Sequence, residues 1–306
     1  MRALQTVSGP LSPSDAAGIA LVHEHLSCDL SSAFGATYSF RDEGLMIAEL
    51  RAAGSRGVTL VVDSGNADHR RDARSLQRIS VGAALRVVAS TGHYREGFFT
   101  DSVAAKSVEE LAGDMVADIT RGIDGTTVRA GAIGEIGTSG EVPTELERKV
   151  LLAAAAAQRE TGVPLMTHTA EGVGWRAQLE LLSEGGADLD KVVIGHMDCV
   201  DDGAAHRAVI DAGAWLGFDR INSLRWQTDE VRAARLADLM RSGYADRVVL
   251  SQDIATTTRL LAEGAPGYTA ILSEFFPRMI QKGFEIQSLE VLVRRNPWRM
   301  LMGEGE

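Results

Sequence analysis

Eight short, largely apolar runs divide the sequence, and a polar or glycine-bearing turn and a longer amphipathic segment follow each one. The runs span residues 19–26, 58–65, 86–93, 130–137, 163–170, 192–199, 214–221 and 247–254. Apolar runs of this length are typical of strands that are buried on both faces of a parallel sheet. Strand and helix alternating eight times predicts an α/β fold of the (β/α)8 TIM barrel type. A doubly wound sheet is the alternative, but it usually has fewer strands, and no GxGxxG sequence opens a helix here.

The segments between the runs carry helix signals at their ends. Residues 144–162 begin with Thr144 and, three positions later, Glu147, which together form a capping box. Residues 43–57 end at a glycine, as helices often do, and residues 229–243 repeat the amphipathic pattern. These segments are therefore the expected outer helices of the barrel.

Length and composition favour one domain over residues 1–306. No linker or low-complexity run divides the chain, and 45% hydrophobic with 24% charged residues is the profile of a soluble globular protein. The net charge of -11 and the lack of clustered Lys and Arg argue against a nucleic-acid partner and favour binding of a multivalent cation.

The expected location is the cytoplasm, without membrane contact. The N-terminal sequence lacks the apolar core of a signal peptide, and the apolar run VLLAAAAA is too short to span a bilayer. Cys28 and Cys199 form neither a disulfide framework nor a CxxC pair, which fits a reducing compartment.

Polar side chains stand late in five of the apolar runs, where a core strand has no need of them. Active sites of TIM barrels lie at the carboxyl ends of the strands, so these side chains should meet at one rim. Burying six ionisable groups together is costly without a compensating cation. The six residues are His23, His25, Glu135, His168, His196 and Asp253.

Four imidazoles and two carboxylates exceed what one tetrahedral zinc with an open position needs, and they suit two divalent ions. We assign His23, His25 and Asp253 to the more buried ion. His168 and His196 are assigned to the outer ion. Zinc is the expected metal, although manganese, cobalt and iron accept the same ligands.

The sixth residue, Glu135, is assigned as the bridge between the two ions. Two ions that share a bridging hydroxide activate it as a nucleophile and polarise the substrate oxygen. Asp253 lies beside that nucleophile and is assigned as the general base. The predicted reaction class is therefore hydrolysis, with Glu135 and Asp253 as the catalytic carboxylates.

The motifs HEHL, GVPLMTHTA, VIGHMD, GFDRI and LSQD resemble the phosphotriesterase family of the amidohydrolase superfamily. The resemblance covers nearly the whole chain. It implies a metal-dependent hydrolase with two metal ions, and it implies that residues 1–18 form a small β-hairpin that caps the barrel. Phosphotriesterase itself bridges its metals with a carboxylated lysine, whereas this chain has Glu135, as in the branch called phosphotriesterase-related proteins. Efficient organophosphate turnover is therefore not expected.

Four residues near the same rim are candidates for substrate binding: Tyr94, Arg95, Arg220 and Trp226. By motif, Tyr94 and Arg220 match the tyrosine and arginine that orient the lactone or the bridging water in related lactonases. A packing role for Tyr94 and an ion pair of Arg220 with Asp219 are the alternatives. Arginines around a metal centre favour a small polar or anionic substrate, with a carboxylate, sulfonate or phosphate.

The leading functional hypothesis is hydrolysis of a lactone or carboxylic ester, with slow phosphotriester hydrolysis as a side activity. An amidase that acts on N-acyl amino acids or N-acyl taurine is the alternative, and a non-catalytic metal-binding protein is a third hypothesis from another class. The apolar segment at 267–280 favours a homodimer. His69, between Asp68 and Arg70, is predicted to lie at the surface, and His93 and His206 have no assigned role.

Overall fold

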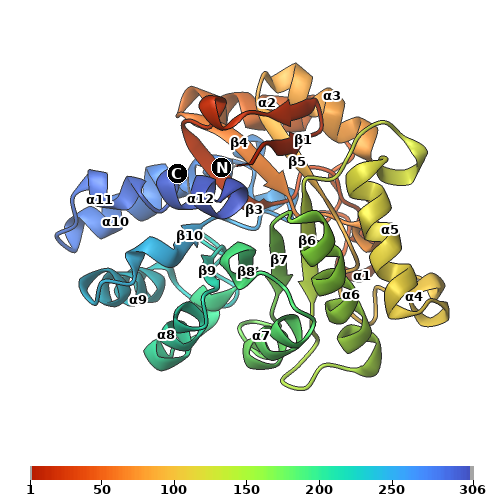
Figure 1. Cartoon of the computed structure of the whole chain (residues 1–306). Helices are drawn as coiled ribbons and strands as arrows, with labels where there is room; N and C mark the ends of the chain where they lie inside the picture. The colour runs from red at the N-terminus through yellow and green to blue at the C-terminus, as the bar shows by residue number, and fades with distance from the viewer. Residues whose placement is uncertain (1, 304–306) are drawn as a thin grey trace.

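Eight parallel strands form the main sheet of the computed structural model, which describes residues 2–303. Their order in the sheet, from β3 to β10, is the same as their order in the sequence (Figure 1). Each strand lies inside one of the predicted runs but is shorter than the run. The strands are β3 Ile19–Glu24, β4 Val58–Asp63, β5 Arg86–Thr91, β6 Ala132–Gly137, β7 Leu165–His168, β8 Val192–Ile194, β9 Trp215–Phe218 and β10 Val248–Leu250.

The two edges of this sheet, β3 and β10, meet through residues at the end of β10. The Ser251 hydroxyl accepts the backbone N–H groups of Val22 and His23 at 2.8 and 2.9 Å. The Asp253 N–H donates to the His23 carbonyl at 3.1 Å. The predicted barrel is therefore confirmed, and its last seam is held partly by a side chain.

Helices cover the outside of the barrel, and Figure 1 shows α5 to α9 following one another around the strands. The capping box of Thr144 and Glu147 forms as predicted at the start of α6, and Gly162 ends this helix in a left-handed conformation. The helices are α1 Ser31–Phe34, α2 Glu43–Ser55, α3 Ala73–Ala83, α4 Asp101–Ala105, α5 Val108–Thr120, α6 Glu145–Thr161, α7 Trp175–Glu184, α8 Gly203–Asp211, α9 Asp229–Arg241, α10 Phe276–Gln281, α11 Ile286–Glu290 and α12 Arg295–Met302.

Side chains that alternate along the strands divide the core in two. Leu21 belongs to the larger cluster, which lies between the strands and the helices. Ala20 and Val22 belong to a smaller cluster, with residues such as Leu60 and Val249 from other strands, that fills the barrel. The filled interior leaves the rim as the place for chemistry.

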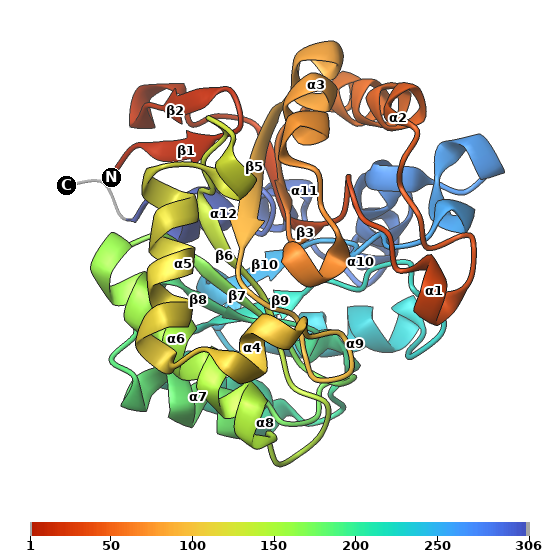
Figure 2. The ribbon, with the colours of Figure 1, turned by 90° about the vertical axis from the view of Figure 1, so that its right-hand side faces the viewer.

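The N-terminal residues form the predicted hairpin, from β1 Leu4–Thr6 and β2 Gly9–Leu11, which pair antiparallel. It lies beside the C-terminal helix α12 (Figure 2). Leu4 and Leu11 join the cluster inside the barrel together with Trp298 of α12. The hairpin and α12 therefore pack on the barrel core through apolar side chains.

The apolar segment 267–280 does not present the exposed face on which the dimer was predicted. Phe275, Phe276 and Met279 are buried against the barrel, and Ile280 is exposed. The dimer stays a prediction without this support. Among the described residues, no helix combines the length and the apolar character needed to cross a bilayer.

Candidate metal centre

The six predicted ligands all lie at the carboxyl-terminal ends of the barrel strands. His23 and Glu135 are within β3 and β6, and His168 is the last residue of β7. His25, His196 and Asp253 follow the ends of β3, β8 and β10. The structure thus brings together every member of the predicted set.

Local backbone geometry presents these side chains to one another. The β3–β4 register shifts between Leu21 and Glu24, which interrupts the alternation just before His25. His196 and Asp253 have φ angles of 60° and 47°, in the left-handed region that side chains other than glycine seldom adopt. Such conformations cluster at functional sites, where the surrounding structure compensates their cost.

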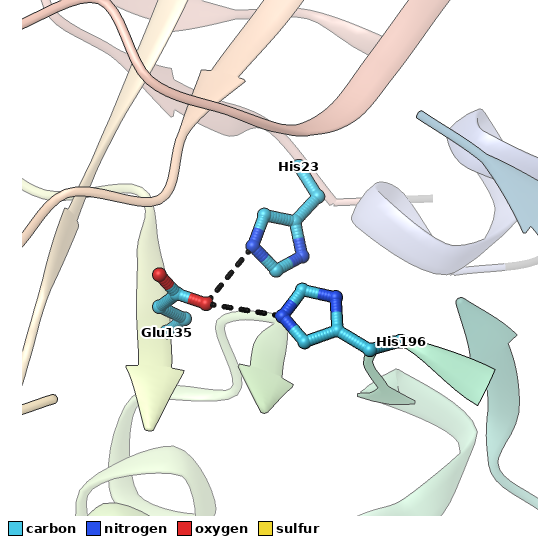
Figure 3. A group of neighbouring side chains, drawn as sticks. All are labelled: His23, Glu135 and His196. Carbon is cyan, nitrogen blue, oxygen red and sulfur yellow. Dashed lines mark hydrogen bonds and ion pairs between the residues drawn. The ribbon is translucent and has the colours of Figure 1, made fainter. Parts of the chain in front are cut away.

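Glu135 lies at the centre of the set, and its two oxygens face different imidazoles. Oε2 is 3.1 Å from Nε2 of His23 and 2.9 Å from Nδ1 of His168. Figure 3 shows His23 and His196 directed at this same oxygen, and the His196 distance is 3.7 Å. Oε1 is 3.4 Å from Nε2 of His25. A carboxylate with nitrogen donors around each oxygen is the arrangement expected of a bridge between two ions.

Asp253 is the second carboxylate of the cluster. Its Oδ1 is 3.1 Å from Nε2 of His25, and its Oδ2 is 3.3 Å from Nε of Arg220. The ion-pair partner of Arg220 is therefore Asp253, and the alternative that paired Arg220 with Asp219 is wrong. Arg220 instead joins the cluster of candidate ligands to the lining of the adjacent cavity.

Asp219 makes two contacts with candidate ligands that sequence reasoning missed. Its carboxylate binds Nδ1 of His23 at 2.9 Å and Nδ1 of His196 at 2.8 Å, and all three residues are buried. A carboxylate that accepts the N–H of a histidine leaves the other ring nitrogen free to bind a metal. The GFDRI motif contained Asp219, but only the fold shows which residues it contacts.

His69 is a second residue that the sequence did not assign to the site. It was predicted to lie at the surface, but it is only 1% exposed, and its Nε2 is 3.2 Å from Oε1 of Glu135. It ends a short 3-10 turn, Ala67–His69, that follows β4. The signal that could have found it is its place a few residues beyond a strand end, as for Asp253.

The charges of the cluster are strongly coupled. Burial lowers the pKa of His25, but its hydrogen bonds to Asp253 and Glu135 outweigh burial and raise that pKa to about 10. Burial raises the pKa of Glu135, but the neighbouring histidines, His168 first among them, hold it well below its usual value. Burial also raises the pKa of Asp253, but its hydrogen bond to His25 and the charge of Arg220 hold it well below its usual value. Both carboxylates are thus held as anions that need positive charge close by.

The chemistry of the donors fits divalent transition metals. Two ligands of one ion, with bonds of roughly 2.0–2.2 Å, lie about 3–3.5 Å apart at tetrahedral or octahedral angles. The distances from Glu135 to His23, His25 and His168 are close to this range. Three sets of ligand atoms each lie within 4.8 Å of one another: His23, Glu135 and His196; His23, His25 and Asp253; and His25, His69 and Glu135.

A cavity of about 510 Å³ opens on this cluster and contains the predicted substrate-binding residues among its lining. Tyr94 is buried, with its hydroxyl 3.1 Å from Nε2 of His168. The guanidinium of Arg95 lies 5.3 Å from the Tyr94 ring, and that of Arg220 lies 5.6 Å from the Trp226 ring. The cavity thus presents cations and aromatic rings to whatever occupies it.

Comparison with known proteins agrees with this site. The model of the phosphotriesterase family matches residues 2–301. A phosphotriesterase homology protein of Escherichia coli (strain K12) is 40% identical over 284 residues, which are 92% of this chain and 97% of the relative. Its crystal structure, with phosphate in the active site, matches with a TM-score of 0.92 and 38% identity over 94% of this chain and 100% of that chain.

Two further relatives are named for their activities. N-acetyltaurine hydrolase of Rattus norvegicus is 30% identical over an alignment of 341 positions, gaps included, which covers 97% of each chain. A variant of a PTE-like lactonase from Deinococcus radiodurans matches with a TM-score of 0.86 and 32% identity, over 97% of this chain and 99% of that one. The fold and these relatives define a metal-dependent hydrolase built on a TIM barrel. The chain belongs to the phosphotriesterase family.

Proposed function

We propose that this hydrolase cleaves a lactone or carboxylic ester that carries a polar or anionic group. The observation that carries the proposal is the position of Glu135, whose two oxygens face separate imidazoles at the base of a cavity that also contains Arg220. Slow hydrolysis of phosphotriesters is the expected side activity.

The proposed ligands are those assigned from the sequence: His23, His25 and Asp253 for one ion, and His168 and His196 for the other. Glu135 would bridge the two, and zinc is the proposed metal. When bound, the ions lower the pKa of a water molecule and polarise the carbonyl oxygen of the substrate.

The chain's own residues supply the proton transfer and the orientation. Asp253 takes the proton of the attacking water at Oδ2, the oxygen that Arg220 also contacts at 3.3 Å, so the carboxylate is held in one orientation. Arg95 and Arg220 attract the anionic group of the substrate, and Tyr94 and Trp226 pack against its apolar part. Glu135 holds the metal ligands in place.

Hydrolysis of an N-acyl amino acid or N-acyl taurine is the second candidate. The arginines of the cavity favour it because these substrates carry a carboxylate or sulfonate, and a relative that is 30% identical is an N-acetyltaurine hydrolase. An amine is a poor leaving group and needs a proton. Asp253, protonated in the first step, donates that proton from Oδ2.

A substrate screen tests the proposal. Protein reconstituted with zinc, manganese or cobalt is offered lactones, aryl esters, N-acyl amino acids, N-acyl taurine and a paraoxon-like triester, with Asp253→Asn as the control. Turnover of lactones or esters that is lost in the control supports the leading candidate. Turnover of the amides alone supports the second candidate, and metal binding without any turnover supports a binding protein.

Location and assembly are part of the same proposal. Cys28 and Cys199 are both free, and Cys28 is buried, which supports a reducing compartment such as the cytoplasm. A homodimer is proposed as well, to be tested by light scattering of the purified protein.

A further inference from the structure

His69 is held in place by Asn66, the residue that caps the 3-10 turn Ala67–His69. Asn66 donates from Nδ2 to the backbone carbonyl of Glu135 at 2.9 Å, and its Oδ1 accepts the N–H of Asp68 at 3.1 Å. These two bonds fix which end of the amide is oxygen. Nδ1 of His69 lies 2.9 Å from that oxygen and 3.4 Å from the backbone nitrogen of Asn66. The shorter contact joins Nδ1 to an atom that can only accept, so we assign the hydrogen to Nδ1, which donates it to Oδ1.

The other ring nitrogen of His69 is consequently free to bind a cation. In the neutral ring, Nε2 has a lone pair and no hydrogen once Nδ1 is protonated. Nε2 is buried and has no hydrogen-bond partner among the described residues. Its neighbour at 3.2 Å is Oε1 of Glu135, which is an acceptor too. Two acceptors face each other across a gap that a shared cation would fill.

The geometry matches a ligand position. Nε2 of His69 and Nε2 of His25 lie 3.2 and 3.4 Å from the same Glu135 oxygen, close to the separation of about 3–3.5 Å expected for ligands of one ion. Donor atoms of the three residues lie within 4.8 Å of one another. The peptide N–H of Glu135 also donates to the Ser64 carbonyl at 2.7 Å, so segment 64–69 is fastened to the bridging residue at two points.

We propose that His69 is a further metal ligand, which binds through Nε2 to the ion held by His25 and Oε1 of Glu135. This inference rests on the proposed metal centre. It adds a nitrogen donor from the turn that follows β4, a strand that supplies none of the six assigned ligands. The ion on this side is then held by donors from four strands or the loops that follow them, β3, β4, β6 and β10.

Two substitutions separate ligation from packing. His69→Asn keeps an amide N–H near the position of Nδ1, for the bond to Asn66, and removes Nε2. His69→Gln keeps a donor atom near the position of Nε2 and loses the bond to Asn66. His93→Asn is the matched control, because His93 also follows a strand but pairs with Asp68 at 3.2 Å, away from the cluster.

The measurements are metal content, chelator competition and the proton NMR spectrum of the cobalt-substituted protein, none of which needs a substrate. We expect wild type and His93→Asn to bind two metal equivalents. His69→Asn should hold one of them more weakly, by at least the roughly 10–100-fold that loss of an outer-sphere partner costs. His69→Asn should also show one fewer paramagnetically shifted exchangeable N–H resonance. His69→Gln should recover part of the affinity.

Each result decides the question. Two equivalents in His69→Asn, with wild-type affinity and the full set of shifted resonances, would overturn the assignment of His69 and leave the metal centre intact. A wild-type protein that binds no metal would overturn both. Equal weakening in His69→Asn and His69→Gln, with the shifted resonances unchanged, would show a packing role and also overturn the proposal.

Discussion

Oδ2 of Asp219 lies 2.9 Å from Nδ1 of His23, and both side chains are almost completely buried. The other oxygen of the same carboxylate binds Nδ1 of His196 at 2.8 Å. Burial raises the pKa of Asp219, but the two histidines outweigh burial and hold it below its usual value. One anion therefore sets the tautomer of two proposed ligands, one for each ion, so that both present Nε2 to the cluster.

Asp219→Asn should weaken metal binding by roughly 10–100-fold. An amide has one acceptor oxygen in place of two, so at least one of the two imidazoles loses its partner. Competition with a chromophoric chelator measures the change. Asp211→Asn removes the same charge from an exposed site on α8 and should bind metal as the wild type does. Equal affinities in the two variants would contradict the role of Asp219.

Asp253→Asn should reduce turnover far more than metal content. General-base catalysis contributes a factor of roughly 10²–10⁴, whereas Glu135 and the four assigned histidines still hold the ions. The comparison needs kcat and metal stoichiometry measured on the same preparation. If metal content fell in proportion to activity, Asp253 would be a metal ligand but not the general base.

Glu135→Ala should lose metal and activity together, because the bridge contacts imidazoles on both sides of the cluster. A glutamate is an anion without added carbon dioxide, so bicarbonate should not change the activity of the reconstituted wild type. Glu141→Ala, in the exposed loop after β6, is the matched control. Stimulation of the wild type by bicarbonate would contradict the assignment.

Arg232→Met should destabilise the fold. The buried guanidinium donates from Nε to Asp198 at 2.5 Å and from Nη1 to Asp229 at 2.9 Å. Removing one partner of such a network costs about 3–5 kcal/mol, since it leaves buried carboxylates unpaired. Arg235→Met, on the same helix, breaks a partly exposed pair with Asp201 and should cost about 0–1 kcal/mol. Urea unfolding measures both, and similar values would contradict the argument.

The sequence predicted the barrel and the six polar positions because both follow from local pattern. Apolar runs specify strands that are buried on both faces, and a histidine or carboxylate late in such a run has to lie at the rim. The lengths of the strands could not be predicted from the same pattern. β8 covers only Val192–Ile194 of the run 192–199, because the chain turns at His196 with a positive φ that no apolar pattern encodes.

His69 and Asp219 show where local pattern is insufficient. His69 stands between charged neighbours, as a surface residue would, and its burial depends on segment 64–69 being bound to β6. Asp219 was weighed only as a partner for Arg220, because adjacent opposite charges can pair. In the fold, Asp219 instead contacts residues from β3 and the end of β8. All of these contacts join segments that are not neighbours in the sequence.

The central claim is that two ions lie on either side of the Glu135 carboxylate. Anomalous diffraction from crystals of the metal-loaded protein, collected on both sides of the absorption edge, tests it most directly. We predict two anomalous peaks within bonding distance of Glu135, one near Oε1 and His25 and the other near Oε2 and His168. A single peak, or peaks that Glu135 does not contact, would contradict the claim.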